Sequence, residues 1–308
     1  MTRMRKFILS WPVMLTAAAV SLASQVLSTS VHAGSVSSFY PDLGEDGWIV
    51  DTSIFECSLV QQIPDFGTAV FYHQAGESMR FYLRSPNSPM QEGRALLTSQ
   101  PPRWRQDLQV RDLAYVDVQR SRQPVVMDAA QSQLLIAELG RGMVPTLMRR
   151  AWFSDTESVH VGISPVRFGE AYAEYHQCQG NLLPVNFAQI ERSTVFWQSN
   201  QRELSAQQQA QLDDIVTYMK ADPAVYAVDI NGFTDSAGNA RDNLELSRIR
   251  AFAVQTYLVE QGIDENMLTT RYFGSTPQFR IVRNEQSAED RDRNRRVTLR
   301  LHRDGSGD

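Results

Sequence analysis

The sequence predicts an α+β protein made of two parts with different patterns. From residue 34 to residue 180, short runs of β-branched and aromatic residues alternate with turn-forming clusters, as in an antiparallel β-sandwich or an open barrel. From residue 193 to residue 303, strand patterns alternate with helix patterns, which predicts a mixed sheet with helices packed on one face. The chain has 308 residues, of which 42% are hydrophobic and 21% are charged. These values fit two globular domains of ordinary size.

The first 33 residues have the pattern of an export signal. Arg3, Arg5 and Lys6 precede a mostly apolar stretch, and a polar region with small residues leads up to Ala33. We therefore expect cleavage after Ala33 and a mature protein in the periplasm. An uncleaved membrane helix is the alternative, because the apolar stretch is long enough to be considered for spanning a bilayer. The formal net charge of −5 is not that of a nucleic-acid-binding protein.

The part from residue 34 to residue 180 is predicted to consist mainly of strands. One helix is expected from Ala129 to Leu139, with Gly140 as its C-cap. Turn clusters rich in Gly, Pro and Ser separate the strands. Strand-forming runs cover residues 70–73, 79–83, 113–118, 125–127 and 159–163.

The two cysteines, Cys57 and Cys178, lie near the two ends of this part. In an oxidising compartment such a pair predicts a disulfide that ties the first strands to the last segment. Two unpaired buried cysteines are the alternative. His176 near Cys178 is poor evidence for a metal site, because no matching pair of ligands accompanies it. No metal and no cofactor are therefore expected.

A connector, residues 181–192, leads into the second part. Ser205 is a predicted N-cap for a helix that runs to about Lys220 and ends before Asp222-Pro223. In the last strand Val297, Leu299 and Leu301 alternate with polar residues, so one face is expected to be exposed. Predicted strands cover residues 193–198, 225–230, 267–273 and 297–302, the last as part of a final hairpin; residues 276–290 are predicted to form an irregular surface insertion and residues 304–308 a disordered tail.

The segment from residue 228 to residue 251 contains the most informative candidate binding residues. The strand before it is predicted to break at Gly232, to present Thr234 and Asp235, and to turn again at Gly238, where glycine tolerates a positive φ. A helix is expected to start near residue 241 and to run to residue 260. Arg250 lies in the first third of this helix.

Asp235 and Arg250 are predicted to face one small cavity at the end of the sheet. Such a pair suits a zwitterionic amino-acid centre, because the carboxylate accepts from an ammonium and the guanidinium grips a carboxylate. A purely structural salt bridge between Asp235 and Arg250 is the alternative.

Several blocks of this part form one pattern when they are taken in order. They are Gly232 to Asp235 with Gly238, then Asn243, Leu246, Ser247, Arg250 and Ala251, then Gly262-Ile263, and Asn294 to Val297. In this order they resemble the OmpA-like peptidoglycan-binding family. The resemblance covers about residues 190–302. One departure is Phe233, which stands where many members have His.

This resemblance implies a binding site for peptidoglycan. In that family an Asp and a helix Arg hold the free D-centre of diaminopimelate in the stem peptide. The corresponding residues here are Asp235 and Arg250, and the resemblance implies that the pocket is lined by Thr234, Asn243, Leu246 and Arg295.

The order of the two parts and the long-range cysteine pair are similar to the MotY family of flagellar T-ring components. The resemblance implies that the N-terminal part meets the basal body and a MotX-like protein, and that the ring helps to hold PomA/PomB-type sodium-driven stator units. A generic OmpA-family envelope protein, tethering another complex or the outer membrane to the wall, is the alternative.

No catalytic motif is present in the sequence. There is no HExxH, no G-x-S-x-G elbow and no P-loop. We therefore expect a binding protein that is not an enzyme, with a wall-cleaving enzyme as the alternative. The arginines between Arg291 and Arg303 are expected to pair with Asp290 and Asp292 or to be solvated, rather than to bind nucleic acid.

Overall fold

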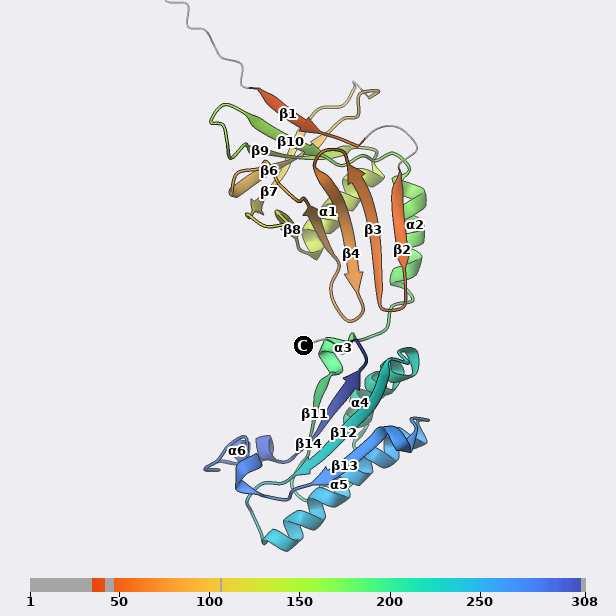
Figure 1. Cartoon of the computed structure of the whole chain (residues 1–308), viewed down its shortest axis with the longest axis vertical. Helices are drawn as coiled ribbons and strands as arrows, with labels where there is room; N and C mark the ends of the chain where they lie inside the picture. The colour runs from red at the N-terminus through yellow and green to blue at the C-terminus, as the bar shows by residue number, and fades with distance from the viewer. Residues whose placement is uncertain (1–34, 42–46, 106, 306–308) are drawn as a thin grey trace, which may run out of the picture. The chain divides into compact units, whose positions relative to one another are not determined.

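The computed structural model describes residues 35–41, 47–105 and 107–305. The expected signal segment, residues 1–33, lies outside this range, as do residues 306–308 of the expected tail. Within the described residues, no helix is both long enough and apolar enough to cross a bilayer. The α+β fold class is confirmed: a β-rich N-terminal part precedes a mixed sheet with helices (Figure 1).

The first sheet of the N-terminal part has five strands. All neighbours are antiparallel except the first two, which are parallel. In spatial order the strands are β1 (Val36–Phe39), β10 (Ser158–Gly162), β9 (Val144–Arg150), β6 (Gly93–Gln100) and β7 (Arg111–Val118).

The second sheet is antiparallel throughout. Two helices, α1 (Ala129–Gly140) and α2 (Phe168–Gln179), accompany the sheets; α1 contacts strands of both sheets, and α2 contacts two strands of the second. One hydrophobic core contains residues from both sheets and both helices, so the two sheets and the two helices stabilise each other. In spatial order the strands of the second sheet are β2 (Trp48–Thr52), β3 (Glu56–Ile63), β4 (Gly67–Gln74), β5 (Arg80–Arg84) and β8 (Val125–Met127).

The predicted disulfide is present between Cys57 on β3 and Cys178 on α2. The two Cα atoms are 6.0 Å apart, which is within the usual range for this bond. Cys57 is fully buried and Cys178 is nearly so. The bond therefore ties an interior strand of the second sheet to the last helix of this part.

The prediction for the N-terminal part was wrong in two details. Helix α2 was not predicted, because its buried residues are few and widely spaced: Phe168, Tyr175 and Cys178. Gly140 is the last residue of α1 rather than its cap. The chain reverses at Gly142, whose φ of +76° requires the freedom of glycine.

The C-terminal sheet has four strands. The last strand in sequence lies in the interior of the sheet, antiparallel to both neighbours, while β12 and β13 are parallel. The expectation of a final hairpin is therefore wrong. In spatial order the strands are β11 (Arg192–Phe196), β14 (Arg296–Arg303), β12 (Val225–Phe233) and β13 (Leu268–Tyr272).

The helices α4 (Ala206–Ala221) and α5 (Ala240–Glu260) supply the apolar cover of this sheet. The inward alternation predicted for Val297, Leu299 and Leu301 is confirmed, since all three are buried in this second core. Ser205 caps α4 as predicted: its side chain accepts a hydrogen bond from the backbone N–H of Gln208. The helices therefore lie on the face where the sequence pattern placed the core.

The remaining segments are short. Helix α3 (Phe187–Ile190) lies in the connector, and the 3₁₀ turn η1 (Glu265–Met267) precedes β13. The segment predicted as irregular contains η2 (Pro277–Phe279) and the start of α6 (Ala288–Asn294). In the expected tail, Asp304 and Gly305 form a turn, and the Asp304 N–H donates to the Ala224 carbonyl at 2.9 Å.

Gly232 does not break its strand. Strand β12 continues through Gly232 to Phe233. A side chain at Gly232 would place Cβ 2.4 Å from the carbonyl oxygen of Ser247 on α5, so glycine is needed for the close approach of this helix to the strand. The predicted turn at Gly238 is confirmed by its φ of +84°.

Candidate functional site

The site is built on the loop that connects β12 to α5. The Thr234 N–H donates to the Gly274 carbonyl at 2.9 Å. The Asp235 Oδ1 atom accepts from the Ala237 N–H at 3.1 Å, and the Asn243 side chain donates to the Asp235 and Ala237 carbonyls at 3.3 and 2.8 Å. Asn243 thus reaches back from α5 to fix the turn, and Asp235 is held in a nearly buried position.

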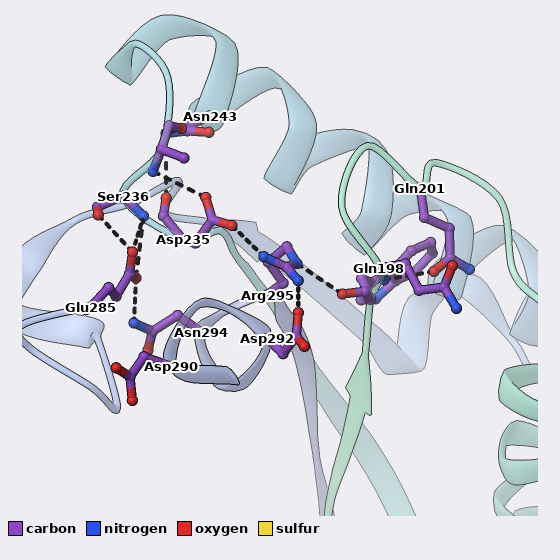
Figure 2. Close-up of polar contacts among 12 residues, drawn as sticks. Gln198, Gln201, Asp235, Ser236, Asn243, Glu285, Asp290, Asp292, Asn294 and Arg295 are labelled. Carbon is purple, nitrogen blue, oxygen red and sulfur yellow. Dashed lines mark hydrogen bonds and ion pairs between the residues drawn. The ribbon is translucent and has the colours of Figure 1, made fainter. Parts of the chain in front are cut away.

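Arg295 forms the ion pair with Asp235. Its Nη1 lies 2.6 Å from Oδ2 of Asp235, and both side chains are about nine-tenths buried. Its Nε donates to the Trp197 carbonyl at 3.1 Å, and its Nη2 pairs with the Asp292 carboxylate (Figure 2). The expectation that arginines in this region pair with Asp292 is met at Arg295.

Arg250 is fully buried and binds backbone rather than a carboxylate. Its Nε donates to the Gln201 carbonyl at 3.0 Å and its Nη2 to the Gln198 carbonyl at 2.8 Å. The guanidinium carbon lies 5.5 Å from the centre of the Trp197 ring, a cation–π distance. Among the described residues, Arg250 and Asp235 form no direct ion pair, so the structural salt bridge considered as an alternative involves Arg295 instead.

Electrostatics still couple Arg250 to the other two charges. Burial lowers the pKa of Arg250 to about 10, and the nearby positive charge of Arg295 adds to this effect. The negative charge of Asp235 opposes it. A pKa of about 10 leaves Arg250 charged at neutral pH, so the site combines two cations with one nearly buried carboxylate.

Three buried polar atoms around this site have no hydrogen-bond partner among the described residues. They are Nη1 of Arg250, Oγ1 of Thr234 and Nε1 of Trp197. Buried donors are nearly always paired in folded proteins. The Arg250 guanidinium lies over the Trp197 ring, and Thr234 directly precedes Asp235 in the loop. These unpartnered atoms are the observation that most directly indicates a ligand site here.

Leu246 is the remaining predicted pocket residue, and Phe233 is the position that departs from the family pattern. Leu246 is half-buried on α5, between Asn243 and Arg250 in sequence. Phe233 is stacked on Phe273 with ring centres 5.3 Å apart, and the Arg296 guanidinium lies over its ring at 4.2 Å. The phenylalanine at this position therefore belongs to an aromatic and cationic stack.

Sequence analysis missed the residues that hold the loop from the other side. The Asn294 side chain accepts from the N–H groups of Ile281 and Val282 at 2.8 and 3.1 Å. It donates to Glu285 at 2.5 Å, and Glu285 accepts from the N–H and hydroxyl of Ser236, next to Asp235. Asn294 belongs to a recognised motif, but Glu285 stands in a polar segment with no periodic pattern to mark it.

A groove of about 670 Å³ adjoins the Arg295 side of the site. Neither Asp235 nor Arg250 is among its lining residues. Within the described part of the chain, no three His, Cys, Asp or Glu side chains are grouped so that they could hold a metal ion. The groove is lined by Phe196, Trp197, Gln198, Ser199, Glu289, Asp292, Arg293 and Arg295.

Comparison with known proteins assigns the two parts to families. Residues 196–295 match the model of the OmpA family, so the C-terminal part is a domain of that family. Residues 39–184 match the model described as the MotY N-terminal domain. The chain therefore carries a MotY N-terminal domain followed by an OmpA-family domain.

Individual known proteins are similar to this chain over different shares of its length. The chain is 27% identical to the sodium-type flagellar protein MotY of Vibrio parahaemolyticus over 258 residues, which cover 83% of this chain and 86% of the relative. It is 34% identical to outer membrane protein A of Bordetella avium over 115 residues, which cover 37% of this chain and about half (53%) of that relative. The peptidoglycan-associated lipoprotein from Burkholderia pseudomallei aligns with 25% identity and a TM-score of 0.33, over 35% of this chain and 89% of that structure.

Proposed function

We propose that this chain is a non-enzymatic anchor of a flagellar motor that binds peptidoglycan through its C-terminal part. The mature protein works in the periplasm, attached to the cell wall and to the flagellar basal body. The membership of the two parts in the MotY and OmpA families supports this function. The similarity to a sodium-type flagellar protein over most of both chains supports the motor role.

The wall-binding site consists of Thr234, Asp235, Asn243, Arg250 and Arg295, together with Leu246. The observation that carries this assignment is the unpartnered Nη1 of the fully buried Arg250, together with the unpartnered hydroxyl of Thr234, the residue before Asp235. A D-amino-acid centre offers a carboxylate for the guanidinium and an ammonium for Asp235. We assign this centre to diaminopimelate in the stem peptide.

The N-terminal part, residues 34–180, is the module that meets the basal body and a MotX-like partner. It has its own core, and its disulfide spans nearly the whole part. The C-terminal module, residues 193–303, has a second core. Two separate cores are consistent with two separate roles. The N-terminal module joins the T-ring, and the C-terminal module binds the wall. The ring then helps to hold PomA/PomB-type stator units.

Retention on purified sacculi tests the wall-binding step. The mature chain is mixed with sacculi and sedimented, and the amount of protein in the pellet is compared with that of a control without sacculi. We expect the protein to co-sediment and free diaminopimelate to compete. A protein that stays in the supernatant would refute the assignment.

A general envelope tether of the OmpA family is the second candidate, supported by the 34% identity to outer membrane protein A of Bordetella avium. Deletion of the gene separates the two functions. Loss of swimming with an intact envelope supports the motor role, whereas normal swimming with a leaky envelope supports the general tether.

A further inference from the structure

Arg295 lies between two carboxylates that differ in their surroundings (Figure 2). The side chain of Asp235 is 11% exposed and that of Asp292 is 60% exposed. Asp235 belongs to the loop after β12, whereas Asp292 belongs to α6. Because charges interact more strongly where water is excluded, Arg295 is held more firmly by Asp235 than by Asp292.

Arg295 already pairs with the Asp235 carboxylate, so a ligand ammonium that binds there must share this one negative charge with a second cation. The Oδ1 atom already accepts from the backbone N–H of Ala237, and Oδ2 accepts from Nη1 of Arg295 at 2.6 Å. An incoming ammonium therefore competes with Arg295 for the same carboxylate. The cost of this competition depends on where the Arg295 guanidinium can go.

Asp292 offers that second position. It already pairs with Nη2 of Arg295, and Arg295 follows α6 directly, so the guanidinium needs only to turn towards the helix. Helix α6 is fixed at its start by a capping box between Ser287 and Asp290 and at its end by its last residue, Asn294, which is fully buried. Asp292 is thus a stationary acceptor, exposed enough to take the guanidinium without deep desolvation.

We propose that Arg295 is an internal competitor for Asp235, and that Asp292 is a positioning residue that draws Arg295 away and so raises the affinity of the site for a ligand amine. This inference rests on the proposed function. The competition affects how the site binds the primary ammonium of the cell-wall amino acid. It does not affect how the site binds the carboxylate. Arg250, held by two backbone carbonyls, does not take part in the exchange.

The variant Asp292→Asn tests the proposal, with Glu289→Gln as its matched control. Glu289 lies on the same helix, lines the same groove and carries the same charge, but it forms no ion pair with Arg295. Because partly exposed ion pairs contribute about 0.2–1 kcal/mol, we expect Asp292→Asn to bind sacculi about 1.4- to 5-fold more weakly than Glu289→Gln. Retention equal to that of Glu289→Gln, or tighter, would overturn the proposal.

Sacculi whose free amines have been acetylated supply a second readout. On these the ammonium is absent, so the wild type and Asp292→Asn should bind equally if Asp292 acts through the amine. A variant that is merely misfolded would bind both kinds of sacculi more weakly, and that result would also count against the proposal. Failure of the wild type to bind native sacculi would instead remove the proposed function on which this inference rests.

Discussion

Glu285 is bonded to Ser236, the residue that follows Asp235. The Glu285 carboxylate accepts from the Ser236 N–H at 2.9 Å and from its hydroxyl at 2.6 Å, and the Asn294 side chain donates to it at 2.5 Å. The polar segment before α6 is thereby tied to the loop that presents Asp235. The placement of the Asp235 carboxylate thus depends on residues outside the proposed binding site.

The first prediction concerns Glu285→Gln and pH. Although partial burial opposes its ionisation, the hydrogen bonds from Ser236 and Asn294 hold the pKa of Glu285 below its usual value. Its stabilising effect is therefore complete above the unfolded pKa of about 4.3 and is lost as pH falls through the lower folded pKa. We expect the free energy of unfolding of the wild type to exceed that of the variant by a constant amount above about pH 5, and the difference to shrink at lower pH. Urea denaturation across pH measures this.

Glu289→Gln is the control for that series, because Glu289 is exposed in the first turn of α6. A gap between the wild type and Glu285→Gln that stays constant from pH 7 to pH 3 would show that the Glu285 carboxylate is not responsible.

The second prediction concerns Arg250→Lys. Lysine keeps the positive charge, but its single ammonium cannot donate the two separate hydrogen bonds that the guanidinium makes to the Gln198 and Gln201 carbonyls. Because a buried acceptor left without a donor costs about 1–3 kcal/mol, we expect a lower melting temperature as well as weaker retention on sacculi. Arg248→Lys is the matched control, since Arg248 on the same helix is partly exposed and pairs with Glu245. Equal behaviour of the two variants would contradict the role of Arg250.

Local patterns predicted the framework of the C-terminal part. The alternation of Val297, Leu299 and Leu301 placed the core face of β14, and Ser205 placed the start of α4, because each signal is carried by neighbouring residues. The order of the strands was not predicted. The alternation of apolar residues along a strand does not indicate which strands are its neighbours, so it could not predict that β14 pairs with both β11 and β12.

The candidate site shows the same division between local and long-range information. The position of Asp235 after a strand and of Arg250 on the next helix was read from adjacent motifs. That Asp235 pairs with Arg295 depends on a contact between residues 60 positions apart. That Arg250 is covered by backbone carbonyls depends on a loop 49–52 residues earlier in the chain. Such contacts follow from the tertiary fold and leave no pattern in the local sequence.

The third prediction concerns Asp235→Asn. The substitution keeps the shape of the side chain but removes the charge that both Arg295 and a ligand ammonium require. Breaking one half of a buried charge pair in a complex typically costs about 2–5 kcal/mol, so we expect retention on sacculi to fall by at least tenfold. Co-sedimentation measures the loss. Asp214→Asn, on α4, removes the same charge away from the site and should bind like the wild type; near-wild-type retention of Asp235→Asn would refute the assignment.

The fourth prediction concerns the disulfide. Cys57 and Cys178 close a loop with a sequence separation of 121, for which the chain-entropy model gives about 4–5 kcal/mol of stabilisation. Cys57→Ser, Cys178→Ser and the double variant remove the same bond, so we expect all three to lower the free energy of unfolding by similar amounts. Chemical denaturation with and without a reductant measures this, because reduction should bring the wild type down to the level of the variants. A double variant much less stable than either single variant would show that the cysteines stabilise the fold separately, through packing rather than through their bond.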